Sequence, residues 1–397
     1  MVAVSDVELA ASTANIVTQP RVDEADSFVL HAPLELAARV GLLPWVREGR
    51  RDLARQRIAA VGSQFEAFGP AVSPPRRLDP VSPAEAAGYL GAAVSAGELD
   101  DADAAAAALA GSARAQELPG LLADTMLASL AAAGHACIFL HLLPRVAPRG
   151  ELPVELLRPL VRELARHPEW NLTWFDEEQP GDGPHDLAAA LTGLPHLGLN
   201  GSAFIYPTMH QVEVTGVAPA HLGRAVQHTS VVDAVQTISR LAARSMLVEP
   251  DDHAPFGWTH ALTMPQAVLS VAAGCADPRR AVAVAATYLA GFRTSLGVAD
   301  LTEPFDPTEP SGNLEWALAE HPASAAAAVW HADRSEHTMI KSTLASEAAV
   351  HQDAHVAKYT LACFDAAESD PAEARTYLSA AAHLLAVWIE HPVDIST

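Results

Sequence analysis

Three side chains that can bind metals or transfer protons recur at helical spacing in the segment Ser346–Ala367. Read as one helix, this segment places His351, His355 and Lys358 at i, i+4 and i+7, so all three project from one face. The segment is rich in Val, Ala and Leu, which predicts that this face points into the protein. Burying two imidazoles and an amine is unfavourable unless a metal ion or a hydrogen-bond network satisfies them.

Lysine is scarce in this chain, and its position is therefore informative. Only Lys341 and Lys358 occur, against twenty-three arginines. Arginine keeps its proton in proteins, whereas a buried lysine can lose it and then act as a base or nucleophile. A neutral lysine can also take up carbon dioxide and become a carbamate, which is an anionic oxygen ligand. The alternative is that the Lys358 side chain extends to the surface.

Three more of the eighteen histidines have distinctive surroundings. His31 enters an apolar helical segment. His135 follows Gly134 in a stretch of small residues that lets another element approach closely. His260 is expected in a turn beside two aromatic residues, just before a helix. A packed core or loop histidine is the commoner role for each one taken singly, although neutral imidazole is the commonest metal ligand in proteins.

The segments around these residues resemble segments of the questin oxidase family, a group of helical oxygenases of fungi and actinobacteria. DAHVAKYTLAC (353–363) resembles the family's Asp-x-His-x-x-Lys segment and is the most specific match. FGWTHALTMPQAVL (256–269) resembles its His-x-Val-Thr segment, with Leu262 in place of Val. SFVLHAPLELAARVGLLPWV (27–46) and LADTMLASLAAAGHACIFL (122–140) resemble its other two histidine segments.

The resemblance implies a non-haem Fe(II) centre whose ligands are His31, His135, His260, His355 and a carboxylated Lys358. It also implies an oxygenase that acts on an aromatic polyketide such as an anthraquinone, by oxidative ring opening or Baeyer–Villiger-type insertion. The expected partners are then dioxygen and an aromatic small molecule. Five ligands leave one octahedral position open, as a catalytic metal requires. A nitrogen and oxygen ligand set without thiolate suits iron, manganese, zinc or copper.

Several alternatives remain open at this point. His351 is the rival of Lys358 as a ligand, and Asp353 is expected to cap the helix or support a ligand. The same ligands would serve a zinc- or manganese-dependent hydrolase or lyase. A non-catalytic acidic helical binding protein, with packed histidines and a free Lys358, is the third possibility. An apolar substrate pocket is expected from a set of aromatic and sulfur side chains, for which core packing is the alternative: Phe204, Tyr206, Met209, Phe256 and Trp258.

Alanine-rich segments of helical period, separated by Pro and Gly, dominate the chain. They predict an all-α fold with a single large multi-helix domain over residues 26–397, long irregular loops, and a loosely ordered segment at 1–25. The apolar stretch 118–143 predicts one helix that Pro144 ends. Strand-like alternation occurs only at 199–216, where irregular structure or a short hairpin is expected.

Composition narrows the function classes. Forty-eight acidic against twenty-five basic residues give a net charge of −23, which argues against binding to nucleic acid or to anionic membranes. No run of eighteen apolar residues lacks a charge, so no membrane span is expected. Three separate cysteines suggest neither a disulfide framework nor a cysteine metal site.

The N-terminal twenty residues contain no basic region, which predicts no signal peptide and, with the few cysteines, a cytoplasmic protein. No Gly-x-Gly-x-x-Gly or P-loop motif is present, so a flavin or nucleotide domain is not expected. NADPH remains possible as a cosubstrate, but the sequence gives it no location. The oligomeric state cannot be inferred.

Overall fold

The computed structural model describes residues 5–24, 27–79, 81–150, 152–176, 182–198, 205–309 and 312–390. Within these ranges the regular structure is helical, and no strand longer than an isolated bridge occurs. The predicted all-α fold is therefore confirmed. The first helices are α1 (Asp6–Val17), α2 (Ser27–Leu42), α3 (Glu48–Glu66), α4 (Pro83–Ala96), α5 (Leu99–Ser112), α6 (Leu118–Met126), α7 (Ala136–Gly150) and α8 (Leu157–Arg166).

The second part of the chain is also helical. It contains α9 (Leu187–Thr192), α10 (Ile205–Val214), α11 (Gly223–His228), α12 (Val231–Val248), α13 (Thr259–Ser270), α14 (Pro278–Leu296), α15 (Leu314–Leu318), α16 (Pro322–Trp330), α17 (His337–Ala348), α18 (Ala354–Ser369) and α19 (Ala374–Glu390). Within the described residues, no helix combines the length and the apolar character needed to cross a lipid bilayer.

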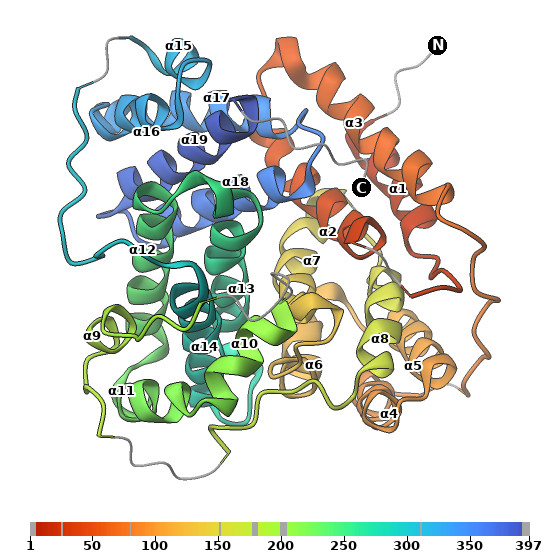
Figure 1. Ribbon diagram of the computed structural model, residues 1–397. Coiled ribbons are helices and arrows are strands. Elements are labelled where there is room, and N and C mark those ends of the chain that lie inside the picture. Colours follow the sequence, from red (N-terminus) through yellow and green to blue (C-terminus); the bar gives the residue numbers. More distant parts are fainter. Residues whose placement is uncertain are drawn as a thin grey trace.

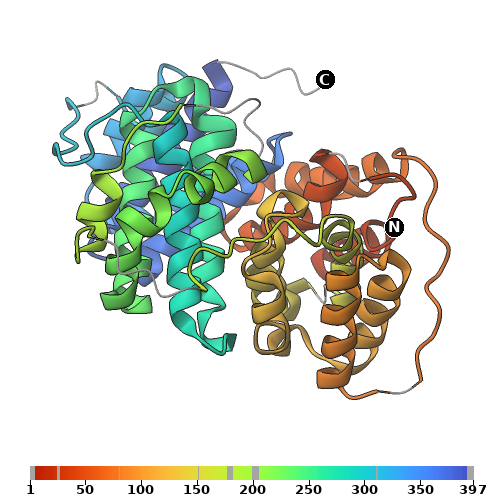
Figure 2. The ribbon, with the colours of Figure 1, turned by 60° about the horizontal axis from the view of Figure 1, so that its bottom comes forward.

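The helices form two groups that meet along a central junction (Figures 1 and 2). Helices α1 to α8 make one group, and α9 to α19 make the other. At the junction α2 packs against α7 and α18, and α13 packs against α7 and α18. One continuous apolar core runs through both groups, from Ala10 in α1 to Trp388 in α19. The junction brings together segments that are far apart in the sequence.

Helix α1 corrects the expectation that residues 1–25 are loosely ordered. Ser5 and Glu8 form a reciprocal capping box at its start, which satisfies free amide groups of the first turn. Ala10, Ala14 and Val17 are fully buried against the core. The i, i+4, i+7 spacing of these small residues gives α1 an apolar face that packs on α3.

The stretch 199–216 is also different from expectation. Residues 205–214 form helix α10, which packs on α14, while 199–204 lie outside the described residues. The buried side chains of α10 include Ile205, Thr208, Met209 and Val212. Their spacing of three, four and seven residues has the helical period, and burial of that face outweighs the β-branched composition.

Two long helices expected from the sequence are each broken. The apolar stretch 118–143 divides into α6 and α7, separated by a turn, and α7 continues through Pro144 to Gly150 instead of ending there. The segment Ser346–Ala367 divides between α17 and α18, and residues 349–353 lie outside both helices. Each of these two breaks lies beside a candidate ligand, His135 in the first case and His355 in the second.

Arg39 on α2 explains the second break. Its guanidinium is fully buried and donates hydrogen bonds to the carbonyl oxygens of Ala348 at 3.3 Å, Ala349 at 2.7 Å and His351 at 2.6 Å. These carbonyls would otherwise accept from amides further along the helix. A buried cation from a distant helix thus stabilises the end of α17, and the next helix begins afresh at Ala354.

Candidate metal centre

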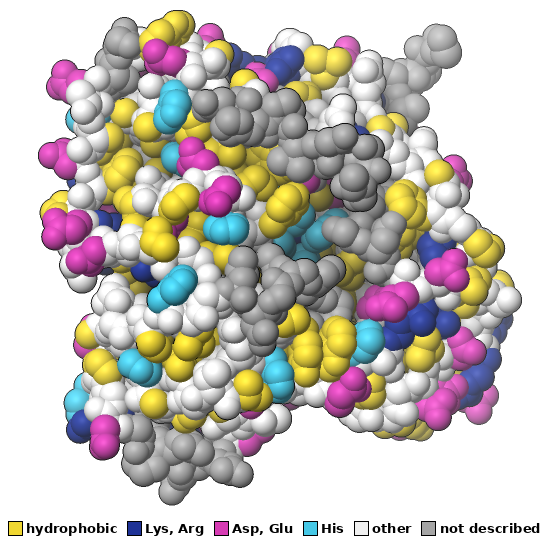
Figure 3. Space-filling view, viewed as in Figure 1, with side chains coloured by type: hydrophobic (Ala, Val, Ile, Leu, Met, Phe, Trp, Pro, Cys, Tyr) yellow, Lys and Arg dark blue, Asp and Glu magenta, His cyan; other side chains and the backbone are white. Residues whose placement is uncertain are grey.

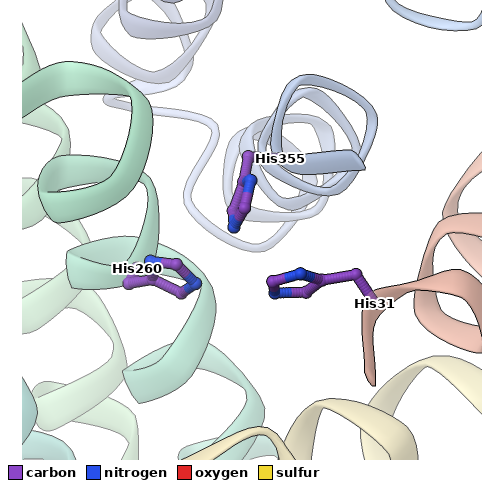
Figure 4. A group of neighbouring side chains, drawn as sticks. All are labelled: His31, His260 and His355. Atoms are coloured by element: carbon purple, nitrogen blue, oxygen red, sulfur yellow. The ribbon is translucent and has the colours of Figure 1, made fainter. Parts of the chain in front are cut away.

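Four histidines from four separate elements converge at the junction of the two helix groups. His31 comes from α2, His260 from α13 and His355 from α18, and Figure 4 shows their rings pointing toward a common space. One ring nitrogen of each of these three lies within 4.8 Å of the others. His135, in the turn before α7, brings its Nε2 to 2.9 Å from Nε2 of His31. All four side chains are between 1% and 7% exposed.

The Nδ1 atom of His135 faces two backbone carbonyl oxygens. They belong to Ala132 at 3.1 Å and Ala133 at 2.8 Å. A carbonyl oxygen only accepts hydrogen bonds, so Nδ1 must carry the ring proton. The Nε2 atom of His135 is then unprotonated, and its lone pair points into the histidine cluster.

His260 and His355 are fixed in the same way. Nδ1 of His260 donates to the carbonyl oxygen of Phe256, one turn earlier. Nδ1 of His355 donates to Oδ1 of Asp353 at 2.9 Å, and that oxygen also accepts from the His355 amide at 2.6 Å. Asp353 is thus both the N-cap of α18 and the support of a candidate ligand, which confirms the role predicted for it. Such outer partners commonly orient metal-bound imidazoles.

The consequence is that two ring nitrogens of the cluster are buried acceptors whose hydrogen-bonding capacity is unused. The Nε2 atoms of His260 and His355 are buried and have no hydrogen-bond partner. Those of His31 and His135 lie within hydrogen-bond distance of each other, at 2.9 Å. Buried polar atoms in proteins are normally satisfied. A metal cation bound between the rings would satisfy the Nε2 atoms of His260 and His355, so these residues fit a metal ion.

Lys358 stands at the edge of this cluster. It lies three residues after His355 on α18, is 4% exposed, and its Nζ is 3.5 Å from Nε2 of His135. Burial lowers the pKa of its amine to about 7, although Asp353 and Glu35 oppose the shift. Much of the amine is therefore neutral near pH 7.

The imidazoles of the cluster are also neutral. Burial lowers the pKa of His31, His135, His260 and His355 below the ordinary value of 6.5, and the nearby Lys358 amine lowers each further. Only neutral imidazoles offer a lone pair to a metal. The protonation states of this cluster thus favour ligation.

His351 does not belong to the cluster. It precedes α18 rather than sharing a face with His355, and its ring lies 5.2 Å from that of Trp388 in an edge-to-face contact. Its Nδ1 accepts from the Asp353 amide at 3.1 Å. The expectation that it projects beside His355 was wrong, because the helix that would have aligned them is interrupted. Lys358, one turn into α18, lies beside the cluster instead.

A cavity of about 610 Å³ opens onto the four histidines, and Lys358 is not among the residues that line it. In Figure 3 histidine side chains are visible near the middle of the face where the two helix groups meet. The remaining lining is largely apolar, with two acidic residues: Glu24, Leu30, Leu130, Ala132, Ala133, Glu163, His167, Trp170, Ile205, Tyr206, Pro207 and Phe256. A metal held by these histidines would thus have one side open to the cavity.

Stacked rings form one wall of this cavity. Trp170 stacks on His167 with ring centroids 3.8 Å apart, and Tyr206 stacks on the other side of Trp170 at 4.3 Å. Phe256 makes an edge contact with His355 at 5.2 Å. Trp170 follows α8 in an irregular segment and was not among the pocket residues predicted from the sequence. Two more aromatic residues close by, Trp174 and Phe175, were the available signal, but they do not indicate where a side chain points.

The predicted pocket residues divide into two groups. Tyr206 and Phe256 line the cavity, whereas Met209 and Trp258 are fully buried and belong to the apolar core. Phe204 lies outside the described residues.

All five residues expected as ligands therefore lie close together: the four histidines line a cavity with an aromatic wall, and Lys358 lies beside them. The arrangement offers four neutral nitrogen ligands and one amine that can be neutral. Comparison with known proteins finds no matching family model, no matching curated protein and no matching solved structure.

Proposed function

We propose that this chain is a non-haem iron(II) oxygenase of the questin oxidase type that acts on an aromatic polyketide-like substrate. The observation that supports this most directly is the convergence of four buried imidazoles on one cavity, where the Nε2 atoms of His260 and His355 have no hydrogen-bond partner. Nitrogen and oxygen ligation without thiolate suits a redox-active iron site. Ferrous iron, when bound, would supply the activation of dioxygen.

The ligands would be the four histidines and the carboxylated side chain of Lys358. Neutral lysine amine reacts with carbon dioxide to give a carbamate and a proton, and the lowered pKa of Lys358 supports this. A carbamate would reduce the charge of a ferrous site from +2 to about +1. This reduction of the positive charge matters, because an uncompensated charge in a buried site is costly.

The cavity would bind a flat apolar molecule. Its volume of about 610 Å³ lies within the roughly 300–1,000 Å³ of typical small-molecule sites. Tyr206 and Phe256 would pack against the rings of the substrate, since aromatic pairs favour stacked and edge-to-face contacts. The histidines at the floor would then face a phenol or ketone group of the substrate. The apolar lining would limit the access of water.

Two reaction outcomes are compatible with such a site. Insertion of one oxygen atom next to a carbonyl, with ring opening, reduces the second atom to water and takes two electrons from a donor such as NADPH. A dioxygenase reaction places both atoms in the product and needs no external electrons. The isotope content of the product after reaction under ¹⁸O₂ separates the two.

Metal content of two matched variants tests the proposal. Lys358→Arg keeps a long cationic side chain but cannot be carboxylated. Lys341→Arg is the control, since Lys341 pairs with Glu368 at 3.1 Å and contacts the Trp45 ring. Purified without added metal or chelator, wild type and Lys341→Arg should each hold about one equivalent of iron, and Lys358→Arg should lose it.

Other outcomes would change the assignment. Iron retained by Lys358→Arg would exclude Lys358 as a ligand. Zinc or manganese in place of iron would favour a hydrolase or lyase on the same residues. No metal, even after anaerobic ferrous loading in bicarbonate buffer, would leave a non-catalytic binding protein. Oxygen uptake with hydroxyanthraquinones by the iron-loaded protein is the matching activity assay.

A further inference from the structure

Two alanines before His135 adopt a backbone conformation that alanine disfavours. Ala132 has φ 50° and Ala133 has φ 49° with ψ 36°, and Gly134 follows with φ 68°. Among the described residues, Ala132 and Ala133 are the non-glycine residues with positive φ. In this left-handed region the Cβ of an L-residue crowds the following carbonyl oxygen. The protein thus holds strain directly beside a candidate ligand.

The strained turn orients two carbonyl groups in a specific way. In a regular helix the carbonyls of residues 132 and 133 would point along the axis to amides four residues on. Here both lie within 3.1 Å of Nδ1 of His135. They hold the ring proton on Nδ1 and direct Nε2 toward His31 and Lys358.

Surrounding contacts hold the turn in this shape. The amide of Leu130 donates to the carbonyl of Trp170 at 2.7 Å, beside an isolated bridge between Ser129 and Asn171. On the other side the buried Tyr288 of α14 occupies the space next to Gly134, where an added Cβ would lie 2.6 Å from its hydroxyl oxygen. Strained backbone persists only when the structure around it dictates the conformation, and it clusters at functional sites.

We propose that Ala132 and Ala133 are positioning residues for His135, and that the turn retains strain in order to fix this imidazole in its Nδ1–H tautomer. The inference rests on the proposed metal centre for its function, but its structural claim concerns the metal-free protein. Glycine would adopt the same turn without strain. It would also move freely there, so the two carbonyls would no longer be held against Nδ1.

The alternative is that the turn only reverses the chain between α6 and α7. The double variant A132G/A133G distinguishes the two, with Ala106→Gly in the middle of α5 as the control. If the strain is real, the thermal midpoint of the double variant equals or exceeds that of wild type. The control, which places glycine in a buried helix, should lower the midpoint.

The tautomer of His135 is the readout that a purely structural role would not change. It is measured in chelator-treated protein at pH 7.5 by ¹⁵N NMR of labelled histidines, with the His135 signals assigned from a variant that lacks this residue. The Nδ1–H form should dominate in wild type and lose share to the Nε2–H form in A132G/A133G. Titration with Co²⁺ should show about tenfold weaker binding and an altered visible spectrum in the double variant.

Unchanged tautomer populations in the double variant would overturn the inference, and so would a midpoint lowered as in Ala106→Gly. If wild type binds no Co²⁺, the proposed metal centre fails. The tautomer and the midpoint of the metal-free protein still decide the positioning role in that case. If wild type binds Co²⁺ and the double variant binds it equally well, the metal centre survives and the positioning role fails.

Discussion

Replacement of Asp353 by asparagine separates helix capping from support of the candidate metal ligand His355. One oxygen of this carboxylate accepts from the His355 amide at 2.6 Å and from Nδ1 of His355 at 2.9 Å. Burial opposes ionisation of Asp353, but the adjacent His355 and Lys358 lower its pKa to about 2. The side chain is therefore charged at neutral pH, and asparagine removes that charge while keeping an oxygen in place.

The size of the effect follows from these contacts. Asparagine and aspartate cap helices about equally well, so the stability of α18 should hardly change. A hydrogen bond to a charged acceptor is about twice as strong as a neutral one, and loss of the charge makes Nε2 of His355 a weaker donor to a metal. Changes to such outer partners typically weaken metal binding by about 10–100-fold, or roughly 1.4–2.7 kcal/mol.

The assay is a titration of chelator-treated protein with Co²⁺ against a competing chelator, together with the thermal midpoint of the metal-free form. Asp186→Asn is the control, because Asp186 caps α9 by accepting from the Ala189 amide at 2.8 Å and is not among the cavity residues. We expect weaker binding in Asp353→Asn alone. Equal affinity in Asp353→Asn and wild type, or equal weakening in both variants, would refute the reasoning.

Two further predictions concern stability. Arg39→Met should lower the thermal midpoint by roughly 4–6 °C. It leaves three buried carbonyl groups without their donor and Glu35 with Arg57 as its remaining cation, at a cost of about 3–5 kcal/mol. The control is a replacement of Arg76, which forms an exposed ion pair with Asp101, and the expected loss of folding free energy is only about 0–1 kcal/mol. Equal shifts of the thermal midpoint in the two variants would contradict the role of Arg39. Chelator-treated protein should also lose stability as the pH falls below about 6.5, because the four histidines of the cluster have pKa values lowered from 6.5 and take up protons first in the unfolded chain. Each of these histidines lowers the free energy of unfolding by up to about 1.4 kcal/mol per pH unit of acidification. Equal thermal midpoints at pH 7.5 and 5.5 would be incompatible with this expectation.

Much of the candidate site could be identified from local sequence. The spacing of His355 and Lys358 on a helix, with Asp353 as the cap, depends on residues within one turn of one another, and the structure has that arrangement. Preferences of this kind depend on residues that are close in the sequence, so the local sequence is enough to predict them. Binding of a metal by these residues stays a prediction.

The breaks that shape the site could not be predicted. Apolar residues of helical period continue across both 127–135 and 349–353, so the local pattern favours an uninterrupted helix in each case. Tyr288 from α14 packs against the first turn, and Arg39 from α2 donates hydrogen bonds to carbonyl groups at the second break. Both partners are more than a hundred residues away along the chain.

The sequence by itself thus determined an all-helical chain and the residue types available for metal chemistry, since composition, period and capping act over a few residues. Only the tertiary structure decided that histidines from α2, α13, α18 and the turn before α7 share one space, that His351 faces Trp388 instead, and that Trp170 lines the cavity. Convergence of this kind depends on which helix faces pack together. That choice is made by burial of apolar surface over the whole core and is not encoded in any one segment.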